Sequence, residues 1–136
     1  MEVIKLNLFT PNGFLKVGGV VLLLVGILGF IGIIGPTPSQ SIFGEFWWFD
    51  NPENVAHTVL GVVGLAAAFV LSRDLQKNLV LLLGVLGILV GLYNFVSPSL
   101  LGANLETPAD LLLHLVVGAW ALYASLSKGD AAAKKE

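Results

Sequence analysis

The chemistry that this chain can offer rests first on its two histidines, His57 and His114. They lie 57 residues apart, and each follows the start of a long apolar segment. Imidazole is rare within a membrane span and marks a functional hypothesis where it occurs. Because neutral imidazole is a standard ligand for metal ions and haem iron, the pair suggests a ligand site, to be weighed against simple packing.

Two forms of such a ligand site are open. In the first, His57 and His114 hold a b-type haem or a related tetrapyrrole. Gly61 and Gly118, one turn further along, would then leave room for the edge of the macrocycle. In the second, Asp110 joins both histidines in a metal site, because borderline divalent ions accept mixed nitrogen and oxygen ligands. Small residues beside a histidine also serve helix packing in membranes, so packing without a cofactor is the leading interpretation.

Composition indicates which elements must position these histidines. Of 136 residues, 56% are hydrophobic and 12% are charged, whereas soluble domains carry about 25% charged residues. Four apolar stretches approach the roughly 20 residues that cross a bilayer as a helix; they cover residues 14–34, 55–71, 79–96 and 111–126. We therefore expect an all-α membrane protein, with one bundle over residues 14–127, an interfacial N-terminus at 1–13 and a tail at 128–136.

Charge placement predicts the orientation. All seven Lys and Arg residues lie at or before the start of the first span, between the second and third, or after the fourth. In the other two loops every charged residue is an acid. Cytoplasmic loops are the ones enriched in Lys and Arg. Both termini are therefore expected in the cytoplasm. The chain has no cysteine for thiolate chemistry and no basic stripe for nucleic acid.

An internal repeat predicts two helical hairpins of similar structure. Residues 23–29 (LLVGILG) resemble 81–87 (LLLGVLG) at an offset of 58, as do SIFG at 41–44 and SLLG at 99–102. The second and fourth spans align at an offset of 57, which aligns His57 with His114. Spans one and three point the same way, so we expect parallel-repeated hairpins with both histidines at one depth.

Two prolines predict where the second and fourth helices begin. Asn51 and Thr107 resemble capping residues, each followed by proline at the first helical position and by an acid in the first turn. These starts place both imidazoles in the outer part of the bilayer.

The outer end is expected to carry a polar cluster and an aromatic loop. If the two histidine faces meet, the cluster consists of Asn54, His57, Asn94, Asp110 and His114. Trp47 and Trp48 lie in the longest loop, and aromatic residues at a membrane surface anchor at headgroup level. We expect them to be interfacial anchors, with a lid over the histidines or a docking edge as alternatives.

Three segments resemble a known family: LVGILGFI at 24–31, NVAHTVLGVVGLA at 54–66 and ADLLLHLVVG at 109–118. They are similar to small bacterial four-span membrane proteins known only as a domain of unknown function. The most specific part is the pair of segments N-x-x-H-x-x-x-G and D-x-x-x-H-x-x-x-G. Family members tend to have Asn-Trp-Leu-His where residues 111–114 read Leu-Leu-Leu-His. The resemblance implies the four-span fold and its topology, in the cytoplasmic (inner) membrane of a bacterium, and carries over no activity, cofactor or partner.

The function expected from the sequence is that of a non-catalytic structural or accessory four-helix bundle. Its partners would be the lipid bilayer and either further copies of itself or a larger membrane complex, contacted through glycine-rich faces. A tetrapyrrole-binding module is the alternative, and a metal- or solute-handling protein is the third hypothesis. Hydrolase chemistry has no candidate serine except Ser97 and Ser99, at the end of the third span.

Overall fold

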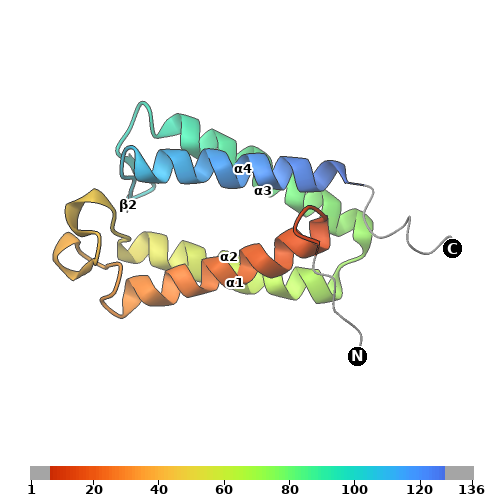
Figure 1. Ribbon diagram of the computed structural model, residues 1–136, viewed down its shortest axis with the longest axis horizontal. Helices are drawn as coiled ribbons and strands as arrows, with labels where there is room; N and C mark the ends of the chain where they lie inside the picture. The colour runs from red at the N-terminus through yellow and green to blue at the C-terminus, as the bar shows by residue number, and fades with distance from the viewer. Residues whose placement is uncertain (1–6, 128–136) are drawn as a thin grey trace, which may run out of the picture.

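The computed structural model describes residues 7–127, which form four long helices joined as two hairpins (Figure 1). The helices are α1 (Pro11–Phe30), α2 (Asn51–Val70), α3 (Arg73–Tyr93) and α4 (Ala109–Leu126). All four are long and apolar enough to cross a membrane. The chain is therefore an integral, multi-pass membrane protein, as its composition predicts.

The two ends of the bundle differ in what joins the helices. At the loop end, α1 connects to α2 through the short 3-10 helices η1 (Pro38–Gln40) and η2 (Gly44–Phe46). The strands β1 (Ser99–Leu100) and β2 (Ala103–Asn104) pair antiparallel in the α3–α4 connection. The opposite, terminal end holds the α2–α3 turn, the start of α1 and the end of α4 (Figure 1). Residues 1–6 and the predicted tail at 128–136 lie outside the described residues.

The first and third helices begin before the apolar stretches do, because capping groups rather than hydropathy set helix ends. The Thr10 hydroxyl accepts from the Gly13 nitrogen at 3.1 Å, so α1 starts at Pro11, inside the segment predicted as an interfacial N-terminus. The Ser72 hydroxyl likewise accepts from the Leu75 nitrogen at 3.4 Å at the start of α3. The predicted first span ended at residue 34, but α1 ends at Phe30.

The cap of α2 lies one residue before the predicted Asn51. The Asp50 carboxylate accepts from the Glu53 nitrogen and the Glu53 carboxylate accepts from the Asp50 nitrogen, each at 3.0 Å. This reciprocal pair is a capping box and satisfies two backbone donors at once. The first-turn acid of α2 therefore has a structural use.

The predicted Thr107 cap of α4 is wrong. Pro108 occupies the N-cap position and supplies no side-chain cap. The Thr107 hydroxyl instead accepts from Asn94 Nδ2 at 3.0 Å, which ties the end of α3 to the start of α4. The predicted first-turn acid, Asp110, is present and buried.

The second helices of the two hairpins repeat each other residue by residue. The buried residues of α2 are Glu53, Asn54, Gly61, Gly64, Ala67 and Ala68. Adding 57 to each number gives the buried residues of α4, which are Asp110, Leu111, Gly118, Ala121, Ala124 and Ser125. The offset of 57 predicted for these two spans is therefore confirmed.

The first helices also repeat each other, but the predicted offset of 58 is wrong. The buried residues of α3 are Gln76, Val80, Gly84 and Gly91, and subtracting 65 from each gives Pro11, Leu15, Gly19 and Gly26, all buried in α1. Contacts agree: a Cβ on Gly61 would lie 2.7 Å from the Leu23 nitrogen, and one on Gly118 would lie 2.8 Å from the Ile88 nitrogen. Leu23 and Ile88 are 65 residues apart.

Glycines line both seams, the contact lines of α1 with α2 and of α3 with α4. At eight glycines an added Cβ would press against the neighbouring helix; these are Gly19, Gly26, Gly29, Gly61, Gly84, Gly87, Gly91 and Gly118. Small residues of this kind let membrane helices approach closely. These glycine-rich faces are used inside the chain, which corrects the expectation that they are free to contact partners.

The hydrophobic core lies at the terminal end, where all four helices meet. Its buried members are Phe14, Leu15, Ala67, Ala68, Val80, Ala121 and Ala124. The Trp120 ring packs edge-on against Phe14 at 4.5 Å between centroids, and its Nε1 donates to the Leu8 carbonyl at 2.7 Å. Between the hairpins, α1 contacts α3 and α4, and β2 contacts α2.

Candidate functional site

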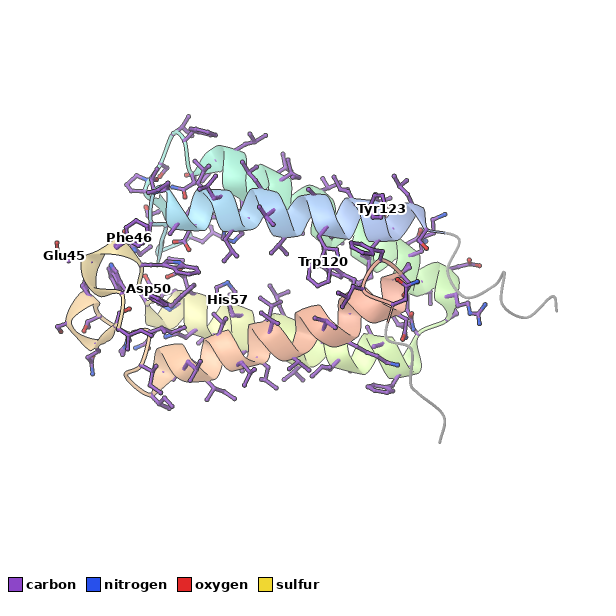
Figure 2. The ribbon with its side chains drawn as sticks, in the orientation of Figure 1. Glu45, Phe46, Asp50, His57, Trp120 and Tyr123 are labelled. Carbon is purple, nitrogen blue, oxygen red and sulfur yellow. The ribbon has the colours of Figure 1, made fainter. Side chains whose placement is uncertain are left out.

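The two histidines occupy equivalent positions, His57 in α2 and His114 in α4, related by the confirmed offset of 57. Both are half-buried and lie beside the seam residues rather than among them. In Figure 2 the His57 ring points from α2 toward the other hairpin, near the loop end. His57 therefore faces the hairpin that carries its counterpart, His114.

The tautomer of His114 follows from its hydrogen bond. His114 Nδ1 lies 2.7 Å from the Asp110 carbonyl oxygen, and because that oxygen can only accept, Nδ1 donates. In the neutral ring the lone pair is then on Nε2, which has no hydrogen-bond partner among residues 7–127. A backbone carbonyl that holds Nδ1–H is the usual support of an imidazole that binds a metal through Nε2.

His57 has no hydrogen bond to any residue from 7 to 127, and its Nδ1 is buried. Its ring packs edge-on against Phe49 at 5.7 Å between centroids. Phe49 is 2% exposed and packs in turn on Trp47 at 5.3 Å. We name Trp47 and Phe49 the aromatic bridge, because they lead from His57 toward the second hairpin.

Asp110 accepts a hydrogen bond from Trp47, the member of the aromatic bridge that lies farther from His57. Trp47 Nε1 donates to Asp110 Oδ1 at 2.8 Å, and the Glu106 nitrogen donates to Oδ2 at 2.6 Å. Asp110 is fully buried, and a buried carboxylate needs such donors. A continuous path of contacts thus runs from His57 through the aromatic bridge and Asp110 to His114.

A second hydrogen bond joins the hairpins at the loop end. Asp50, which caps α2 with one oxygen, accepts from the Asn104 nitrogen in β2 with the other at 2.7 Å. We name this bond and the Trp47–Asp110 bond the loop-end latch. Sequence patterns do not predict the latch, because both bonds join segments more than fifty residues apart.

The predicted single polar cluster does not form, because the two asparagines lie in separate seams. Asn54 Nδ2 donates to the Phe49 carbonyl at 3.1 Å, and Asn54 Oδ1 faces the Cα hydrogens of Gly29 in α1. Such Cα–H···O contacts recur where helices approach closely. Asn94 Nδ2 donates instead to Thr107 Oγ1, and both residues belong to the α3–α4 hairpin. Each asparagine therefore fastens its own hairpin at the loop end.

The two asparagines come from different helices of their hairpins, although the hairpins repeat each other. Asn94, the C-cap residue of α3, stands where α1 has Gly29, at the offset of 65. Leu111 of α4 stands where α2 has Asn54, at the offset of 57. Each hairpin thus buries one asparagine at this level, contributed by its second helix in one case and by its first in the other.

Gly61 and Gly118 do not border the space between the histidines, contrary to the first ligand hypothesis. A Cβ on Gly61 would meet Leu23 of the same hairpin, and one on Gly118 would meet Ile88. Both glycines are therefore occupied by seam packing, which corrects their assignment as cofactor-binding residues.

The metal site predicted from Asp110 and the histidines lacks a ligand set. Within residues 7–127, no group of three or more His, Cys, Asp or Glu side chains is arranged to hold a metal ion. Both Asp110 oxygens already accept hydrogen bonds from the latch and from Glu106. Asp110 acts here as a structural acceptor.

Of the two predicted interfacial anchors, Trp47 is turned inward. Its indole nitrogen bonds Asp110 and its ring contacts Phe49, which favours the alternative of a cover over the histidines. Trp48 is half-buried, and its role as an anchor stays a prediction.

No family model, curated protein or solved structure matches this chain. The fold and the site alone therefore define its class, a membrane protein of two repeated helical hairpins. Its distinguishing feature is a histidine at the same position in each hairpin, with the loop-end latch above the pair.

Proposed function

We propose that this protein is a non-catalytic accessory component of the bacterial cytoplasmic membrane, which packs against further copies of itself or a larger membrane complex. The observation that carries this proposal is that the buried acids accept hydrogen bonds within the fold. Glu53 closes a capping box, and Asp110 receives Trp47 and Glu106. Both acids therefore serve as acceptors for the fold, and neither side chain hydrogen-bonds a histidine or a serine within residues 7–127.

The serines of the α3–α4 connection support the same interpretation. The Ser97 hydroxyl donates to the Ser99 carbonyl at 2.8 Å and accepts from the Ser99 nitrogen at 3.3 Å. Neither serine hydrogen-bonds a histidine among the described residues, so the arrangement of an activated nucleophile is missing there.

The outward faces suit contact with lipid or with another membrane helix. Val59, Val62 and Leu112 are each more than half exposed, on α2 and α4. Because the glycine-rich faces are used within the hairpins, a partner would meet Val, Leu and Phe side chains. Such faces bind another helix by close packing rather than by a hydrophobic driving force, since lipid tails are equally apolar.

Charge supports an orientation with the terminal end in the cytoplasm. Lys16, Arg73 and Lys77 lie at that end, and Asp50 and Glu106 lie at the loop end. The enrichment of Lys and Arg in cytoplasmic segments then places both termini inside. A fluorescent protein fused to the C-terminus should fluoresce, and alkaline phosphatase inserted at Gly102 should be active. The opposite pattern would contradict this orientation.

The accessory role is tested by extracting the tagged protein, expressed at its native level, directly into polymer-bounded lipid discs. The expected result is a particle that holds several copies of the chain or a second protein at constant molar ratio. Mass photometry and quantitative mass spectrometry measure both quantities. A particle that contains one 14.4 kDa chain and lipid would overturn the proposal.

A further inference from the structure

We infer that His57 and His114 form an axial-ligand site for a metal-bearing tetrapyrrole, held between the two hairpins near the loop end. This inference goes beyond the proposed accessory role, which needs no cofactor. It rests on the free ring nitrogens, on the number of ligands and on where the hairpins meet.

The ring nitrogens are the first step. His114 presents an Nε2 lone pair while its Nδ1–H is held by the Asp110 carbonyl. His57 has a buried Nδ1 and no hydrogen-bond partner in residues 7–127. The second ring nitrogen is the one open to a ligand, because Nε2 of each imidazole is neither buried nor hydrogen-bonded to a residue from 7 to 127.

The number of ligands selects the class of ligand. A bare zinc ion is held by four ligands in a structural site and by three in a catalytic one, and no third His, Cys, Asp or Glu joins the pair among the described residues. A tetrapyrrole brings four in-plane nitrogens of its own, so its metal needs only one or two axial ligands. Two imidazoles from opposite hairpins match that requirement.

The place follows from how the hairpins meet. Their contacts are concentrated in the core around Phe14 and Val80 at the terminal end and in the latch at the loop end. Figure 1 shows α2 and α4 in different hairpins. Within each hairpin the helices are closely packed along their glycine seams, whereas α2 and α4 are not among the closely packed helix pairs, so the proposed ligand would lie between α2 and α4.

The aromatic bridge would cover such a ligand on the loop side. Phe49 already contacts the His57 ring, and Trp47 reaches Asp110, whose carbonyl positions His114. Flat apolar rings stack favourably on aromatic side chains. Trp47 and Asp110 are therefore positioning residues for this site, and the histidines are the ligands.

The test uses the full-length protein in detergent, titrated with haem b and followed by absorbance in the oxidised and dithionite-reduced states. We expect one haem per chain and the spectrum of six-coordinate, low-spin iron. Both His57→Ala and His114→Ala should lose the six-coordinate spectrum and bind haem roughly tenfold or more weakly, the scale of losing even an outer-shell partner of a metal ligand. Added imidazole should restore the six-coordinate spectrum in either variant.

Matched controls separate the site from unspecific partitioning of haem. Leu112→Ala, an exposed change in the same turn as His114, should bind haem as the unchanged protein does. Circular dichroism shows whether each variant keeps its helices, and imidazole rescue reports on the site even in a destabilised one. The inference is overturned if the unchanged protein shows no spectral shift, or if the double histidine variant binds haem equally well.

Discussion

Replacing Gly61 by alanine tests whether the α1–α2 seam determines stability. A Cβ at Gly61 would lie 2.7 Å from the Leu23 nitrogen and 2.8 Å from the Gly19 carbonyl oxygen. Both are backbone atoms and cannot rotate away, so α1 and α2 must move apart. A Cβ at Gly64, one turn further along α2, would lie 3.7 Å from its nearest neighbours, an ordinary contact. Gly64→Ala is therefore the matched control.

The magnitude follows from two opposing effects. Overpacking a close contact costs about 1–3 kcal/mol. Alanine in place of glycine favours a helix by about 1 kcal/mol, and this gain is common to both variants. Their difference in unfolding free energy should therefore be about 1–3 kcal/mol, with Gly64→Ala the more stable. The second hairpin agrees, since it has Gly118 at the position of Gly61 and Ala121 at that of Gly64.

The assay is reversible unfolding in mixed micelles with increasing dodecyl sulfate, followed by circular dichroism. Gly61→Ala should unfold at a lower detergent fraction than the unchanged protein, and Gly64→Ala at an equal or higher one. Gly118→Ala should resemble Gly61→Ala, because its Cβ would lie 2.8 Å from the Ile88 nitrogen. Equal stability of the Gly61 and Gly64 variants would refute the reasoning.

Two further predictions concern the ends of the bundle. The two hydrogens on Gln76 Nε2 are shared among three carbonyls at the end of α2, those of Ala67, Ala68 and Leu71, at 3.3, 3.1 and 3.0 Å. Gln76→Met should therefore lose about 1–3 kcal/mol of unfolding free energy, because these carbonyls lose this donor. The exposed Asn78→Met should lose little in the same assay, and a similar loss in both would contradict this role. At the loop end, Trp47→Phe removes a donor from Asp110 and should speed amide hydrogen exchange at the start of α4, whereas Trp48→Phe should not. Unchanged exchange in the Trp47 variant would count against the latch.

Hydropathy alone identifies all four helices, because a bilayer demands an apolar helix of a certain length. It locates their ends less well. Asp50 and Thr10 cap their helices through side-chain hydrogen bonds outside the apolar stretches. Helix ends depend on such local bonds, and a window of average hydropathy does not resolve them.

The candidate site divides in the same way. The equivalence of His57 and His114 follows from the offset of 57 in the sequence and is confirmed by the buried faces of α2 and α4. The same offset pairs Glu53 with Asp110, a signal that could have marked both acids as buried. The latch has no comparable signal, since its bonds join distant loops whose meeting depends on the packing of whole hairpins.

The sequence by itself determined the four spans, the faces of the helices and the repeat of α2 in α4. Only the tertiary structure decided which residue of α3 corresponds to a given residue of α1. The predicted offset of 58 and the observed offset of 65 differ by seven residues, nearly two turns of a helix and about 10 Å along its axis. Both offsets place the same face toward the partner helix, so periodicity cannot separate them. The contacts of Gly61 with Leu23 and of Gly118 with Ile88 decide between them, and these exist only once two helices meet.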